Sequence, residues 1–200
     1  ASERKKPDQI DRKMHRIVKA ASSLSYEEVA TEEAALLAEN ALIRELRPVL
    51  NVEGAFTFLY PAIGFGRTER HVLLCFTTQS EEYGTQGLEW YGTFRSRLRA
   101  KLAFDALVEL LGLVGHPEKR AALPAHVSLR GSRLVGVRQL PAGIVESLPR
   151  FLAGEEGAFL GELARALLER PRARREAGDV QEKLVLLKHF FERDAARLHD

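Results

Sequence analysis

Cysteine is almost absent from this sequence of 200 residues, because Cys75 is the only one. A single cysteine excludes a disulfide within the chain, and it excludes zinc or iron–sulfur sites built from cysteines alone. No apolar run approaches the roughly 20 residues of a membrane-spanning helix. The first residues are basic, but no apolar segment follows them as it would in a secretory signal. These absences predict a cytoplasmic protein with no membrane partner.

An excess of one charge is also lacking. The 30 Lys and Arg residues face 28 Asp and Glu residues, which leaves a net charge of +2. Overall charge therefore does not establish a polyanion as partner. The hydrophobic share of 45% is enough to bury a core, as one unit or as two small ones. Cys75 lies between Leu74 and Phe76, so we expect a thiol packed in that core.

Residues 31–47 form the segment with the most informative pattern. Thr31 can cap a helix, and Pro48 marks its end. Glu39 has aliphatic residues three and four positions away on both sides, so its carboxylate is expected within the apolar face. A carboxylate in that place must be protonated, paired with a cation or bound to a metal. The alternative is a glutamate at the edge of the apolar stripe whose side chain bends out to water.

The pattern around Glu39 resembles a nuclease family. The matching residues are Glu33, Ala34, Leu36, Glu39, Leu42, Ile43, Pro48 and Asn51. They are similar to the third helix and following turn of the GIY-YIG nucleases, most closely in UvrC, the incision subunit of bacterial nucleotide excision repair, and its shorter relative Cho. The resemblance implies that Glu39 binds the catalytic divalent metal, Mg²⁺ or Mn²⁺, and that Asn51 supports the same site. It implies a DNA repair endonuclease that cuts a DNA strand.

The resemblance covers only the back half of such a nuclease domain, residues 1–54. The two Gly-Tyr motifs of the first hairpin and the arginine of the next helix are not in this sequence. In the family these residues activate the nucleophile and hold the scissile phosphate, so we expect these 200 residues alone to be inactive. UvrC also carries four cysteines for an iron–sulfur cluster, which we do not expect here. The alternative function is a non-catalytic DNA- or protein-binding module derived from the fold.

Cations gather in two segments that would suit DNA phosphates. Residues 1–20 contain seven basic residues against three acidic ones. A helix expected over 95–113 begins with four cations that oppose the helix dipole, which an anionic ligand would justify. Solvated helix faces, or salt bridges to Glu81, Glu82 or Glu89, are the alternatives. The predicted DNA-contacting residues are Lys13, Arg16, Arg47, Arg95, Arg97 and Arg99.

The remaining pattern predicts an α+β chain in three regions: a partial nuclease domain (1–54), an α+β middle region (55–144) and a helical C-terminal region (145–200). Besides the two helices above, we expect a helix near 9–22 and strands between 55 and 91, with Gly64 to Gly66 as a turn or, less specifically, a phosphate loop. A hairpin is expected to join 127–129 to 134–137. The helical end should comprise 145–153, 158–169 and 180–198, with an arginine-rich link at 171–178.

Two further stretches are similar to UvrC. Residues 90–96, WYGTFRS, resemble the Tyr-Phe-Gly-Pro-Phe-x-Ser stretch that follows its nuclease domain, with Thr93 in place of proline. Residues 151–154 and 191–196 resemble parts of a helical hairpin that contacts UvrB. The resemblance therefore implies a UvrB-like protein as a partner beside DNA.

Overall fold

The computed structural model describes residues 15–46, 60–80, 87–119, 123 and 132–198. The chain divides into two compact units, Ala1–Phe58 and Leu59–Asp200, and each is described by itself. Helices and an antiparallel sheet are both present, so the predicted α+β class is confirmed. Within the described part of the chain, no helix has the length and apolarity needed to cross a membrane.

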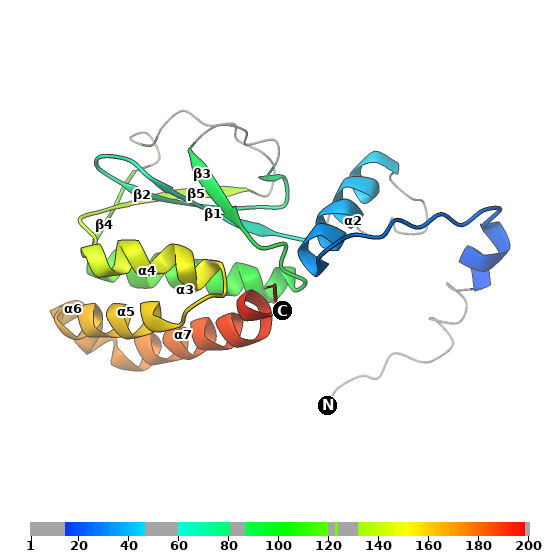
Figure 1. Cartoon of the computed structure of the whole chain (residues 1–200). Helices are drawn as coiled ribbons and strands as arrows, with labels where there is room; N and C mark the ends of the chain where they lie inside the picture. Colours follow the sequence, from blue (N-terminus) through cyan, green and yellow to red (C-terminus); the bar gives the residue numbers. More distant parts are fainter. Residues whose placement is uncertain (1–14, 47–59, 81–86, 120–122, 124–131, 199–200) are drawn as a thin grey trace. The chain divides into compact units, whose positions relative to one another are not determined.

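The first unit contains the predicted helix over 31–47, observed as α2, Glu32–Leu46 (Figure 1). The backbone N–H of Ala34 donates a hydrogen bond to Thr31 Oγ1 over 3.1 Å, which is the expected N-cap. Residues 15–20 are also helical, in agreement with the helix predicted near 9–22. The earlier part of that prediction lies outside the described residues.

The second unit is built on a five-stranded sheet with the strand order β3-β1-β2-β5-β4, in which every neighbouring pair is antiparallel (Figure 1). The strands are β1 (Ala62–Arg67), β2 (Val72–Thr77), β3 (Leu88–Tyr91), β4 (His116–Pro117) and β5 (Arg133–Arg138). The strands predicted between 55 and 91 are observed as β1, β2 and β3, and the one predicted at 134–137 is observed as β5. The segments 55–59 and 127–129 lie outside the described residues.

The turn predicted at Gly64 to Gly66 is wrong, because these residues form the middle of β1. The glycines are there because side chains from β3 lie over them. A Cβ added at Gly64 would come within 2.8 Å of the Trp90 ring, and one at Gly66 within 2.7 Å of Leu88. Glycine in a strand often marks such a close approach. A phosphate-binding loop is thereby excluded at this place.

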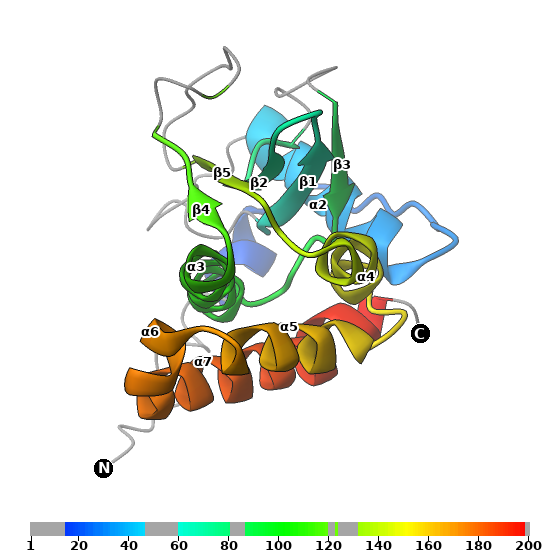
Figure 2. The ribbon, with the colours of Figure 1, turned by 90° about the vertical axis from the view of Figure 1, so that its left-hand side faces the viewer.

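Helices cover one face of this sheet in two layers (Figures 1 and 2). The helices α3 (Arg97–Val114) and α4 (Ala142–Leu152) lie next to the sheet. Beneath them lie α5 (Ala158–Leu168), α6 (Pro171–Arg175) and α7 (Ala177–Phe190), and α7 continues as a π-helical turn η4 (Phe191–Ala195) and a 3₁₀ turn η5 (Ala196–Leu198). The predicted helical end is confirmed.

The link predicted at 171–178 is mostly helical, so that part of the prediction is wrong. Pro171 occupies the first turn of α6, where its fixed φ favours a helix and its missing N–H costs nothing. Ala173 is buried and fixes this short helix against the core. An arginine-rich run that begins with a proline thus forms a helix because one small apolar residue, Ala173, packs against the core.

One hydrophobic core joins the sheet to both helical layers. The ring of Phe94, before α3, packs edge-on against Phe190 of α7, with 4.8 Å between ring centroids. Phe76 of β2 contacts Phe104 of α3 at 5.6 Å. Cys75 is fully buried, as predicted for a core thiol. Residues from the middle region and from the helical C-terminal region therefore share one core.

Candidate functional site

Glu39 lies in the middle of α2 with its side chain exposed. Leu36 and Ile43 on the same helix are buried, whereas Leu42 is half exposed. The expectation that the Glu39 carboxylate is enclosed by aliphatic side chains is therefore wrong, and the alternative, a carboxylate that reaches water, describes it. An exposed carboxylate needs no internal partner, and it is accessible to a metal ion and to a substrate.

The other residues predicted for this part of the site are only partly in view. Arg16 lies in the helical segment 15–20 and is exposed. Lys13, Arg47 and Asn51 lie outside the described residues.

Arg99, one of the predicted DNA-contacting residues, binds a buried carboxylate of its own chain. Its Nε and Nη2 donate hydrogen bonds of 2.8 and 2.9 Å to Oδ2 and Oδ1 of Asp194 in η4. Only 2% of the Asp194 side chain is exposed. These hydrogen bonds raise the pKa of Arg99 above its ordinary value, so the guanidinium stays charged. Asp194, not a phosphate, explains why an arginine is needed at this position.

Lys101 and Arg133 share a second internal carboxylate. Lys101 Nζ lies 2.7 Å from Asp105 Oδ2, and Arg133 Nη1 lies 2.5 Å from Asp105 Oδ1. The Arg133 guanidinium also lies over the Phe104 ring, 5.8 Å from its centroid. Salt bridges within the protein were the predicted alternative to DNA contacts. The acid observed here is Asp105 and not Glu81, Glu82 or Glu89.

The helix α3 begins at Ser96, whose Oγ accepts a hydrogen bond from the Arg99 N–H over 3.3 Å. Its first turn holds no acidic residue, so cations occupy the positive end of the dipole. Arg95 is exposed and Arg97 is partly exposed. Of the predicted DNA-contacting residues in the second unit, these two present their charges without a role in the Asp194 site.

The stretch WYGTFRS joins β3 to α3 and has a clear structural role. Gly92 has a positive φ of 74°, and a Cβ added there would come within 2.3 Å of the Phe94 ring. Phe94 is fully buried, and its N–H donates to the Pro61 carbonyl over 2.9 Å. The glycine and the phenylalanine thus fix the path by which the chain leaves the sheet and enters the helix.

Tyr91, in the same stretch, donates a hydrogen bond from its hydroxyl to Glu89 Oε2 over 2.7 Å. Burial raises the pKa of Tyr91 far above its ordinary value, and the negative charge of Glu89 adds to the shift. A neutral phenol at physiological pH can donate a hydrogen bond, and it is a poor proton acceptor.

The two C-terminal segments that resemble the UvrB-contacting hairpin meet each other. Gly154 has a φ of 79°, and a Cβ added there would come within 2.2 Å of the Ala195 carbonyl oxygen. The Phe151 and Phe191 rings stack at 5.3 Å, and Phe151 is fully buried. Phe151 therefore packs inside the molecule, whereas Phe191 is only partly buried.

The described residues contain no group of three or more His, Cys, Asp or Glu side chains that could hold a metal ion by themselves. Comparison with protein families, with curated proteins and with solved structures found no match to this chain. Function must therefore be argued from the residues themselves.

Proposed function

We propose that this protein is a DNA repair protein of the UvrC/Cho type, whose intact form cuts a DNA strand with the help of a divalent metal. The observation that carries the proposal is the residue pattern of α2 and of the sequence that follows it, up to Asn51. Thr31 caps the helix, and Glu39 lies exposed at its centre. An exposed carboxylate on a well-defined helix is held in a fixed place and can be reached by a phosphate-bound ion.

The described residues suit an ion that is shared between protein and substrate. Mg²⁺ keeps several waters and binds through one or two carboxylates together with substrate phosphates, which requires no cluster of protein ligands. Glu39 would supply one such carboxylate. A bound ion would polarise the scissile phosphate and stabilise the leaving oxygen.

The test is the substitution Glu39→Gln in the protein expressed from its whole gene. The amide keeps the shape of the side chain and removes its charge, so we expect Mg²⁺- or Mn²⁺-dependent nicking of supercoiled DNA to be lost while the circular dichroism spectrum is unchanged. The matched control is Glu28→Gln, an exposed carboxylate that precedes α2, and it should nick normally. Nicking by Glu39→Gln at the original rate would contradict the proposal.

A second candidate is a DNA-binding module without catalysis. Two observations favour it: the sequence contains no Gly-Tyr motifs, and the exposed Arg95 stands at the cationic start of α3. The two candidates differ in one assay. The module predicts salt-dependent DNA binding with no metal-dependent nicking by the product of the whole gene, whereas the nuclease predicts both.

A further inference from the structure

A group of exposed arginines lies where α5 is joined to α7. The one-turn helix α6 and the residue before it carry Arg170, Arg172, Arg174 and Arg175, and all four residues are exposed. Ala173, between them, is only 3% exposed and holds this turn against the core. The arginines therefore have a fixed support, at the end of the helical layer away from the C-terminus (Figure 1).

Three of these residues, which we call the α6 arginines, form no ion pair with any described residue of the chain: Arg170, Arg174 and Arg175. The acids that follow them in the sequence bind other cations. Arg172 Nε donates a hydrogen bond of 3.1 Å to Glu176 Oε1, and Asp179 forms a salt bridge with Lys183. Glu169, just before them, is exposed. The α6 arginines therefore keep their positive charges available to a ligand.

The placement of the α6 arginines is unfavourable within the chain itself. The Arg174 N–H donates to the Arg170 carbonyl over 3.1 Å, so these two residues stand one helical turn apart, where like charges repel. The C-terminal end of α6 meets the N-terminal end of α7, so the two helix dipoles offset each other there. No group in the described part of the chain neutralises these three charges, whereas an anionic ligand would.

We infer that the α6 arginines bind the phosphate backbone of duplex DNA. The basic residues between 165 and 178 are all arginines. The planar fork of an arginine matches two phosphate oxygens at once, whereas a lysine offers a single charged point. An anionic membrane would require a broad apolar face beside the cations, but Leu168 is the only large hydrophobic residue exposed between 158 and 180. The composition of this surface therefore favours a nucleic acid backbone.

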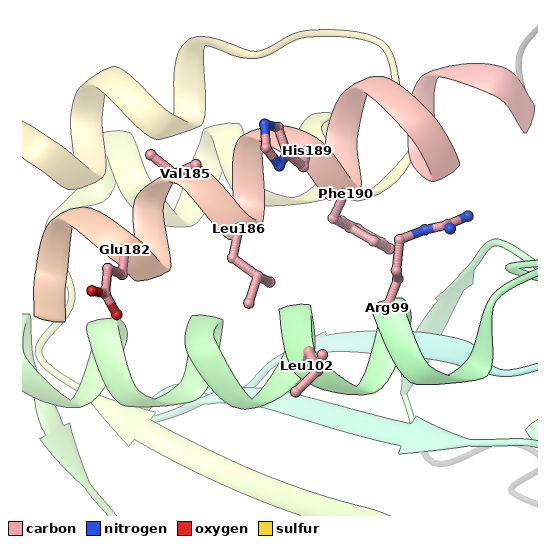
Figure 3. A pocket seen from close by; sticks show the side chains of 7 residues that line it. All are labelled: Arg99, Leu102, Glu182, Val185, Leu186, His189 and Phe190. Atoms are coloured by element: carbon pink, nitrogen blue, oxygen red, sulfur yellow. The ribbon is translucent and has the colours of Figure 1, made fainter. Parts of the chain in front are cut away.

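The α6 arginines form a surface separate from the cationic start of α3. Arg99, near that start, lies beside Phe190 at the far end of α7 (Figure 3). The 14 residues of α7 span about 20 Å, so the two surfaces would contact different phosphates. The inference rests on DNA as the proposed partner, but it uses neither Glu39 nor a metal ion.

Fluorescence anisotropy of the full chain with a duplex oligonucleotide, over a salt series in EDTA, tests this surface. The double substitution Arg174→Ala/Arg175→Ala should lower the slope of log affinity against log salt by about two units, one for each lost phosphate contact. The matched control is Arg150→Ala on α4, which removes an exposed arginine paired with Glu156 over 2.7 Å and should leave the slope unchanged. An unchanged slope in the double variant, or no binding of DNA by the chain, would overturn the inference.

Two further measurements separate DNA binding from other roles of these arginines. The double variant should unfold at the same or a higher urea concentration, because it removes repelling charges from the protein surface. A marked fall in that midpoint would make the arginines structural and overturn the inference. Polyglutamate and phosphatidylserine vesicles are the competing probes. If either bound as tightly as DNA and lost affinity in the same variant, the surface would belong to another anionic partner.

The absence of divalent metal from this assay separates its outcome from that of the nuclease proposal. If the α6 arginines set the salt slope but the product of the whole gene does not nick DNA, the nuclease proposal fails and this inference stands. If nicking depends on Glu39 but Arg174→Ala/Arg175→Ala leaves the slope unchanged, only this inference fails.

Discussion

Asp194 is the buried carboxylate on which the end of the C-terminal helix depends. It lies in the π-helical turn η4, and both of its oxygens accept hydrogen bonds from the planar fork of Arg99. The fork of an arginine matches the two oxygens of a carboxylate, whereas a lysine offers a single charged point. The pair therefore links the first turn of α3 to the end of the C-terminal helix. It also explains why an arginine stands at the start of α3, where the helix dipole disfavours a positive charge.

The first prediction follows from this pair. Arg99→Met should lower the free energy of unfolding by about 2 to 3 kcal/mol, because it leaves a buried carboxylate without its charged donor. Arg165→Met is the matched control, since Arg165 pairs with the exposed Glu162 on the surface of α5, and its cost should stay below about 0.5 kcal/mol. Urea unfolding measures both variants. Equal losses would show that Asp194 does not need Arg99.

The second prediction concerns Tyr91. Burial and Glu89 raise the pKa of Tyr91 in the folded protein, whereas an unfolded tyrosine titrates near pH 10. A raised pKa contributes stability that is complete below about pH 10 and is lost as the pH rises through the folded pKa. Spectrophotometric titration should therefore show a late-titrating phenolate that Tyr91→Phe removes. Tyr26→Phe, which removes an exposed phenol, should leave that late phase in place.

The same sequence signal applied to Glu39 and to Asp194, yet only Asp194 is buried. Phe190, Phe191 and Leu198 stand three or four positions from Asp194, just as aliphatic residues flank Glu39. Helical spacing shows which side chains share a face, but it does not show whether another element covers that face. The cover over Asp194 comes from α3, about 95 residues earlier in the chain. The sequence can thus predict that a carboxylate on an apolar helix face is buried, but it cannot show which carboxylate this is.

At the scale of elements, α3 combines a cationic start with an apolar body. Ser96 supplies the cap, and buried residues from Ala100 to Val114 fix the helix under the sheet. Packing of that face outweighs the unfavourable charges at the dipole's positive end, which are worth only about 0.3 to 1 kcal/mol each. Positive charges at the start of α3 are therefore tolerated.

The third prediction tests the DNA contact predicted for the start of α3. If Arg95 and Arg97 meet DNA phosphates, replacing either with Ala should weaken duplex binding and lower the slope of log affinity against log salt by about one unit. Arg165→Ala, which removes an exposed arginine on α5, should leave the slope unchanged. Fluorescence anisotropy over a salt series measures it. If the DNA affinity of the unsubstituted protein did not depend on salt, Arg95 and Arg97 would not be phosphate contacts.

The limits of local sequence patterns also appear at this scale. The helices α2, α3 and α5 follow from the apolar spacing within each segment, and α2 also from its capping residue Thr31. The sequence predicts a turn at Gly64 and Gly66 because glycine commonly marks one. Their presence in a strand is explained only by the packing of Trp90 and Leu88 from β3. The arginine-rich run that forms α6 was misassigned for a similar reason, since its helix depends on the burial of Ala173.

At the scale of the whole molecule, the sheet and the C-terminal helices belong to one compact unit with one core. Strand β5 pairs with β2, and the same core continues through Phe151 and Phe190. The sequence predicts a region boundary between residues 144 and 145 because the local pattern there changes from one that contains strands to one of helices alone. Which segments share a core is decided by contacts between distant residues, and no local pattern reports these.

The fourth prediction is that residues 59–200 unfold in a single transition, and that the fragment 59–141, which lacks α4 to α7, does not fold. The shorter fragment would lack Phe151, Phe159 and Phe190, which are buried in the core that α3 shares, and the face of α3 that packs against α7 would be exposed. Calorimetry and amide exchange measure the outcome. Matching transition temperatures for the two fragments would show that the helical layer is a separate domain.

The pairing of η4 with the first turn of α3 sets an order for folding during synthesis. Asp194 is made 95 residues after Arg99, and Phe190 is made 96 residues after Phe94, so neither contact can form until the residues of α7 and η4 have left the ribosome. At about 5 to 20 residues per second, translation keeps the inner face of α3 without its final cover for several seconds. Molecular chaperones that bind exposed apolar helices would meet this chain in that interval, and an early stop codon would leave it dependent on them.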